Sequence, residues 1–235
     1  MTAAGAREPT AAARESAADA RVSAAGVRKS TAGVRESAAG VREPTDPASV
    51  DDIEWAVRLL AGTPTHENRD RALLRQWARR ADEFGARLAP VPSTARVVER
   101  GGGLERMLLA RYTSRPPTVE LYTDTLALAE ELVDARGWRH WYPPGSVRAA
   151  ALAHEAVHAH LHHGPAKTAL KQALGHTVLR IGRRRVAGHV AGAEEVAAHA
   201  YARTVCGLGR SPLLLTAALR AALTRPGAAA PRREN

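Results

Sequence analysis

The stretch His154-Glu155-Ala156-Val157-His158 lies inside a segment, Ser146 to His162, whose residues predict an α-helix. Two histidines four residues apart lie on one face of a helix, one turn from each other, so both imidazoles can bind a single ion. Glu155 lies about 100° around the helix from His154, where it can reach a metal-activated water without becoming a ligand. The stretch therefore predicts a Zn2+ site with ligands His154 and His158, built for metal-assisted hydrolysis.

A catalytic zinc site needs a third protein ligand, and the histidines that follow the motif do not provide one. His162 continues the stripe, but it lies about 12 Å along the helix axis from His154, which is too far for one ion. His160 points to another face of the helix. The longer H-E-x-x-H-x-x-G-x-x-H arrangement fails because Leu161 and Gly164 stand where it needs glycine and histidine. We therefore expect the extra histidines to be solvated.

A better source of the third ligand is the segment from Ala193 to Leu208, which is predicted to be helical. It begins with the acids Glu194 and Glu195, where the helix macrodipole favours a negative charge. His199 lies one turn after Glu195 on the same face and could donate a hydrogen bond to a ligand or stabilise an oxyanion. Spacing alone leaves the choice between Glu194 and Glu195 open.

Two stretches complete the pattern: R-A-A-A-L-A-H-E-A-V-H-A-H-L-H-H (Arg148 to His163) and E-x-x-A-H-x-Y-A (Glu195 to Ala202). Together they resemble the ImmA/IrrE-type metallopeptidases, on the gluzincin side of the zincins. That family pairs an A-H-E-x-x-H helix ending in Leu-His with a second helix that carries an E-x-E-A-N-x-F-A-like run. Here histidine replaces the asparagine, tyrosine the phenylalanine and Ala197 the inner glutamate. The resemblance covers roughly residues 115 to 208, and its spacing of 37 residues from His158 to Glu195 is long.

The resemblance implies a zinc-dependent peptidase, with zinc at His154, His158 and Glu195 and with Glu155 as general base and acid. It also implies a zincin-like helical domain with a small sheet beside the motif helix. The expected partner is a protein or peptide substrate, or a regulatory protein. A catalytically inactive zincin-fold module, regulatory or associated with nucleic acid, is the alternative.

Two further roles follow from the resemblance. His199 and Tyr201 are the candidates for stabilising the oxyanion of the tetrahedral intermediate. The segment Thr118 to Tyr122 alternates as a strand does, and it would suit the edge strand that pairs with an extended substrate in such enzymes.

Composition points to helices and limits the kinds of site. Apolar residues make up 45% of the chain and aromatic residues only 4%, so the core must be built largely from alanine, leucine and valine. This favours a mostly α (α+β) fold. The single cysteine, Cys206, excludes a disulfide framework and a cysteine-based zinc site.

The charge of the chain admits a nucleic-acid partner. The formal net charge is +10, and a basic domain can bind nucleic acid. However, the sequence contains no aromatic-interleaved basic stripe and no helix-turn-helix signature. No apolar run approaches the roughly 18–20 residues that span a bilayer, and arginines interrupt the N-terminal segment where a signal peptide is apolar. We therefore expect a cytoplasmic protein without a membrane partner.

The chain divides into three predicted parts. Arginines recur every seven residues from Arg7 to Arg42, but the repeat offers only alanine and some valine for a seam, so we expect residues 1–48 to be a disordered heptad-repeat tail. Residues 49–225 form the expected zincin-like domain, and residues 226–235 a flexible tail. Besides the motif helix, the patterns predict helices at Asp51–Ala61 (with Ser49 as a cap), Glu67–Leu88, Asp124–Ala135, Ala166–Arg180, Ala193–Leu208 and Pro212–Leu223, and strands at Arg96–Glu99 and Thr118–Tyr122.

Overall fold

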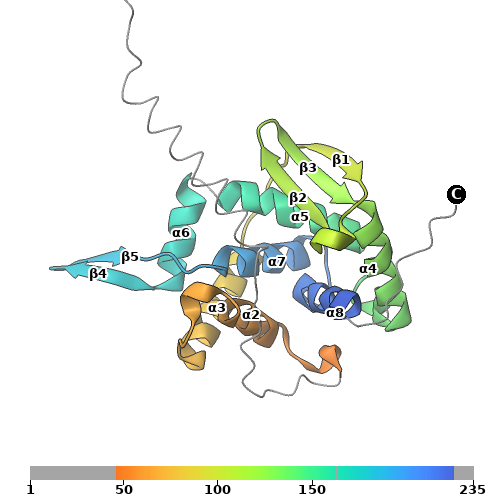
Figure 1. Ribbon diagram of the computed structural model, residues 1–235. Helices are drawn as coiled ribbons and strands as arrows, with labels where there is room; N and C mark the ends of the chain where they lie inside the picture. The colour runs from red at the N-terminus through yellow and green to blue at the C-terminus, as the bar shows by residue number, and fades with distance from the viewer. Residues whose placement is uncertain (1–45, 162–163, 225–235) are drawn as a thin grey trace, which may run out of the picture. The chain divides into compact units, whose positions relative to one another are not determined.

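The fold is mostly helical with a small mixed sheet, seen in a computed structural model that describes residues 46–161 and 164–224 (Figure 1). The helices are α2 (Asp52–Ala61), α3 (Arg71–Ala86), α4 (Thr123–Ala135), α5 (Ser146–Leu161), α6 (Gly164–Leu174), α7 (Ala193–Val205) and α8 (Pro212–Thr224). The strands are β1 (Arg96–Arg100), β2 (Ala110–Ser114), β3 (Pro117–Tyr122), β4 (Thr177–Ile181) and β5 (Arg184–Ala187). The expected α+β class, dominated by helices, is confirmed.

The predicted tails fall almost wholly outside the described residues. The first described element is a short 3-10 helix, Pro47–Ser49, which lies at the boundary expected between tail and domain. Within the described ranges, no helix combines the length and the apolar character needed to cross a bilayer.

Aspartates mark the starts of the first two α-helices. The carboxylate of Asp51 accepts a hydrogen bond from the backbone N–H of Glu54 at 2.7 Å, and that of Asp70 accepts one from Ala72 at 3.0 Å. The expected cap at Ser49 was therefore wrong. The second helix also begins later than expected, at Arg71, because Asp70 caps it and accepts from the N–H of Ala72 in its first turn.

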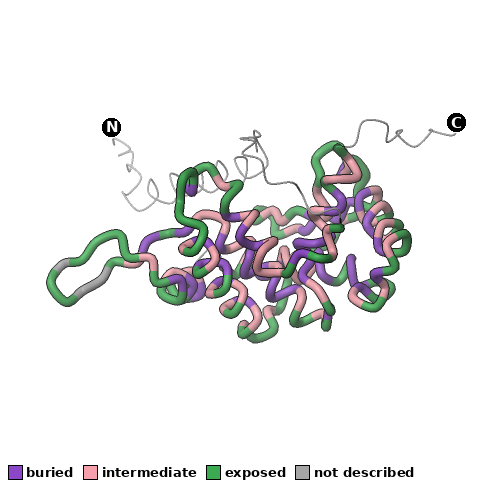
Figure 2. The backbone as a smooth tube through the Cα atoms, turned by 90° about the horizontal axis from the view of Figure 1, so that it is seen from below, coloured by how far each residue is buried: buried purple, intermediate pink, exposed green. Residues whose placement is uncertain are grey.

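Small side chains allow the helices of the main core to pack closely. This core joins α2, α3, α5, α6 and α7, and Figure 2 shows its buried residues running through the helical part of the chain. Its larger members include Leu60, Trp77, Val157 and Leu161. Much of the remainder is alanine: Ala56, Ala78, Ala81, Ala166, Ala193, Ala197 and Ala198. The many alanine side chains thus allow short distances between the helix backbones.

The three-stranded sheet lies beside the motif helix α5, as expected. Its order is β1-β3-β2, with β3 parallel to β1 and antiparallel to β2. Ala151 of α5 packs in one cluster with Val119 and Leu121 of β3. The predicted strand Thr118–Tyr122 exists as β3, but it is the central strand. Its expected role as the edge strand was wrong, because β1 and β2 already occupy both of its sides.

The helix expected at Ala166–Arg180 also differs from the structure. It ends at Leu174 because Gly175 adopts a left-handed conformation, with φ of 64°, which stops a helix without steric cost. The guanidinium of Arg80 donates to the carbonyl of Leu174 at 2.7 Å and satisfies this helix end. The residues from Thr177 onward form the hairpin β4–β5 instead of further helix.

We expect Gly85→Ala to destabilise the protein by about 1–3 kcal/mol or more. A Cβ at Gly85 would lie 2.0 Å from the carbonyl oxygen of Ala197 on α7, and backbone cannot move aside cheaply. This clash outweighs the gain of about 1 kcal/mol that alanine brings within a helix. Urea unfolding measures the difference. Gly101→Ala is the control, because no atom lies within 4 Å of a Cβ there; equal losses in both variants would contradict the close approach.

The pH dependence of stability should reveal the role of Asp124. Burial acts to raise the pKa of this carboxyl, but hydrogen bonds from the backbone N–H groups of Gly103, Leu104, Thr125 and Gly102 lower it below its usual value. Because the pKa is lowered on folding, the stabilisation is present above about pH 4 and lost as the pH falls.

Asp124→Ala should therefore lower the free energy of unfolding by about 0.5–1 kcal/mol at pH 7, since solvent screens this partly exposed carboxylate, and the loss should shrink as the pH falls below about 4. Glu131→Ala, at an exposed position of the same helix, should change little at either pH. A loss in Asp124→Ala that is independent of pH would argue against the charged hydrogen bonds.

Candidate metal centre

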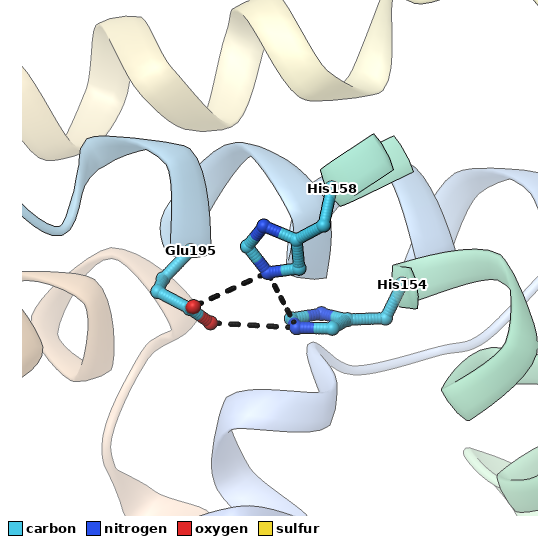
Figure 3. Close-up of side chains that lie close together, drawn as sticks. All are labelled: His154, His158 and Glu195. Atoms are coloured by element: carbon cyan, nitrogen blue, oxygen red, sulfur yellow. Dashed lines mark hydrogen bonds and ion pairs between the residues drawn. The ribbon is translucent and has the colours of Figure 1, made fainter. Parts of the chain in front are cut away.

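Helices α5 and α7 bring three potential ligands together. His154 and His158 lie one turn apart on α5, with their Nε2 atoms 2.9 Å from each other. Glu195 reaches them from the first turn of α7: its Oε2 lies 3.3 Å from Nε2 of His154 and its Oε1 lies 3.2 Å from Nε2 of His158 (Figure 3). Each residue offers one ligand atom, and these atoms all lie within 4.8 Å of one another.

The spacing of these atoms fits one tetrahedral ion. A zinc ion with bonds of about 2.0–2.1 Å separates its ligand atoms by about 3.3–3.4 Å. The observed separations of 2.9, 3.2 and 3.3 Å need only small side-chain adjustments to match. The side chain of Glu195 is 36% exposed, so one side of the cluster stays accessible. Two imidazoles and a carboxylate could thus hold a metal ion with a position open for another ligand.

The structure separates the two acids that the sequence left as alternatives. Glu194 faces His189, with its Oε1 3.8 Å from Nδ1 of that histidine. Glu195 points between His154 and His158 (Figure 3). Glu195 is therefore the acid that belongs to the cluster.

The protonation of the cluster follows from its mixed charges. Burial acts to lower the pKa of His158, but the carboxylate of Glu195 outweighs it and raises the pKa to about 9. Burial acts to raise the pKa of Glu195, yet the two histidines hold it well below its usual value. At neutral pH the metal-free cluster thus holds an ionised carboxylate and a protonated His158. A metal ion must displace that proton, since only neutral imidazole is a ligand.

His199 lies beside the cluster, one turn after Glu195. Its ring centroid is 4.4 Å from that of His154, with the planes inclined at 50°. Burial and the neighbouring charge of His154 lower the pKa of His199 well below its usual value, so it is neutral at pH 7. The Nδ1 atoms of both rings are buried without a hydrogen-bond partner among the described residues. The expected proximity of His199 to a ligand is present, and it takes the form of ring packing.

Glu155 has a partner that the sequence did not indicate. Its Oε2 accepts a hydrogen bond from the backbone N–H of Tyr112 at 2.8 Å. Tyr112 lies on β2, whose other side pairs with β3, so this N–H belongs to the free edge of the sheet. The charge of Glu155 also helps to raise the pKa of His158.

Tyr201 occupies a different environment. Its side chain is buried in the main core, and its hydroxyl accepts a hydrogen bond from the backbone N–H of Val91 at 2.7 Å. The hydroxyl thus anchors the segment that follows α3, and its predicted role at an oxyanion stays a prediction. His160 is exposed, as expected, whereas His162 and His163 lie outside the described residues.

Comparisons with protein-family models, with curated proteins and with solved structures find no match for this chain. The resemblance to ImmA/IrrE-type metallopeptidases rests on the motif residues alone. The case for a function therefore depends on the geometry of the cluster.

Metal analysis of the purified chain should find about one zinc ion per molecule. Glu195→Ala should lose most of the metal, by about 10-fold or more in affinity, because one of the three ligands is gone. Glu194→Ala is the matched control, since its carboxylate faces His189, and it should keep the metal. Unchanged zinc in Glu195→Ala, or a loss confined to Glu194→Ala, would refute the ligand assignment.

Proposed function

We propose that this protein is a zinc-dependent metallopeptidase. The observation that carries the proposal is the convergence of His154 and His158 from α5 with Glu195 from α7, with Glu155 the next residue after His154 on the same helix. Zinc bound by these three residues would acidify water and polarise a carbonyl group. The same donor set also suits non-haem iron; a neighbouring carboxylate that binds no metal favours hydrolysis, because hydrolysis needs a general base.

Glu155 is the residue that would move protons. Its carboxylate would accept a proton from the attacking water and then donate it to the nitrogen of the leaving amine. The N–H of Tyr112 holds Oε2 at 2.8 Å, which orients the carboxylate and leaves Oε1 available for the proton. Neutral His199 can add a hydrogen-bond donor beside His154, where charge develops on the carbonyl oxygen.

The edge of the sheet supports a peptide as the substrate. In an antiparallel ladder, alternate residues of an edge strand direct both their N–H and their C=O groups away from the sheet. In β2 these residues are Ala110, Tyr112 and Ser114, because Leu109 pairs through its carbonyl with β3. An extended peptide could add to this edge as a further strand. The N–H of Tyr112 is bonded to Glu155, so such a peptide would pair through the other groups of this edge and pass the proton-transferring carboxylate.

The proposal predicts that Glu155→Gln keeps zinc but loses hydrolysis by about 10²–10⁴-fold. Glutamine preserves the size of the side chain and its contact with Tyr112, but it cannot accept a proton. Zinc content and cleavage of a diverse fluorogenic peptide library are measured on the same preparations. Glu194→Gln is the control and should keep both zinc and activity.

Two outcomes would contradict the proposal. Turnover retained in Glu155→Gln would refute the role of this carboxylate. A zinc-loaded wild-type protein that cleaves no peptide of the library would instead favour the inactive zincin-fold module.

A further inference from the structure

The hairpin β4–β5 extends away from the helices in both views of the chain (Figures 1 and 2). Its strands pair antiparallel with each other, and among the described residues neither strand joins the three-stranded sheet. A lone two-stranded hairpin is at best marginally stable in water. The position of this hairpin therefore raises the question of what it binds.

All charged residues of the hairpin and of the preceding helix α6 are basic. Residues 164–193 contain no aspartate or glutamate, and they contain six basic residues: Lys167, Lys171, Arg180, Arg183, Arg184 and Arg185. Arg180 and Arg183 are exposed. The backbone register places Arg180 opposite Arg185, so both strands carry basic residues. A polyanion would complement this charge.

Apolar side chains lie exposed on the same hairpin. Val178, Leu179 and Val186 are 59%, 54% and 44% exposed, respectively. Leu179 and Val186 are directly opposite each other in the register, so they form a small apolar patch on one face of the hairpin, whereas Arg180, the next residue, belongs to the other face. Single exposed apolar residues need no explanation, but three on one thin hairpin indicate a surface that contacts a partner.

We propose that the β4–β5 hairpin binds double-stranded DNA, a function that goes beyond the proposed hydrolysis and does not depend on the metal centre. The major groove of B-DNA, about 12 Å wide, admits a two-stranded β-ribbon. Arg180 and Arg183 would contact phosphates on the groove walls. Leu179 and Val186 would contact apolar groups such as thymine methyls.

The composition of the hairpin region argues against other polyanionic surfaces. Residues 164–193 contain no phenylalanine, tryptophan or tyrosine, so they offer no aromatic platform on which single-stranded bases stack. Double-stranded RNA has a deep, narrow major groove that side chains cannot read. Membrane-surface segments insert several tryptophan, phenylalanine or leucine side chains, and of these residue types the hairpin contains only Leu179. Duplex DNA can be bound by basic side chains that contact its phosphates and by a β-ribbon that fits its major groove, and the hairpin offers both features.

Fluorescence anisotropy with a labelled 20-base-pair duplex tests the proposal on the full chain. Affinity should fall linearly on a log–log scale between 50 and 200 mM salt. Arg180→Ala/Arg183→Ala should weaken binding about 10-fold or more and reduce the salt slope by about 2, because two phosphate contacts are lost. Arg180→Lys/Arg183→Lys should keep most of the affinity, and circular dichroism checks that each variant is folded.

Arg96→Ala/Arg220→Ala is the matched control, because it removes two exposed arginines from β1 and α8, elements that lie apart from the hairpin (Figure 1). It should bind as the wild type does. The proposal is overturned if the wild type does not bind the duplex at 50 mM salt. It is equally overturned if both double-alanine variants lose the same affinity, or if the hairpin variant loses binding to anionic phosphatidylserine vesicles while keeping binding to DNA.

Discussion

The close packing of α7 against α3 and α5 is the constraint on which the cluster of His154, His158 and Glu195 depends. Glu195 reaches the two histidines of the motif helix from α7, so its distance from them is set by the position of that helix. Gly85 permits the approach from the side of α3, since any side chain there would collide with the backbone of Ala197. Arg203 of α7 adds two ion pairs, to Asp52 at 3.0 Å and to Asp82 at 2.9 Å. The alanine-rich core, and Gly85 where α3 meets α7, let the helices lie close together. This closeness brings Glu195 of α7 to the histidines of α5.

Local periodicity explains which parts of the fold were predictable. The helices and the positions of His154 and His158 follow from spacing along a single segment, which needs no knowledge of the tertiary structure. Strand β2 and the hairpin β4–β5 were not predicted, because short strands are defined by their partners as much as by their residues. The helix expected through Arg180 failed at Gly175, whose left-handed conformation stops α6. Strand β3 was predicted, but its central position in the sheet was not, because the sequence of one strand does not show which strands pair with it.

In the site, too, the residues within one motif could be predicted, whereas contacts between distant segments could not. The motif resemblance pointed to Glu195, and the structure brings it to the histidines. The partner of Glu155 could not be predicted, because a backbone N–H such as that of Tyr112 carries no residue-specific signal in a sequence. Tyr201 lies six residues after Glu195, about 240° around the helix, and its hydroxyl accepts a hydrogen bond from the N–H of Val91. The motif could not predict this contact, because it depends on the path of the segment that follows α3.

Zinc K-edge X-ray absorption of the zinc-loaded protein examines the cluster itself. Ligation by His154, His158 and Glu195 predicts a shell of four or five nitrogen and oxygen atoms at about 2.0–2.1 Å. The multiple-scattering signal should correspond to two imidazoles and fall to one in His158→Ala. A sulfur ligand at about 2.3 Å, which only Cys206 or a methionine could supply, or a spectrum unchanged in His158→Ala, would show that the metal binds elsewhere.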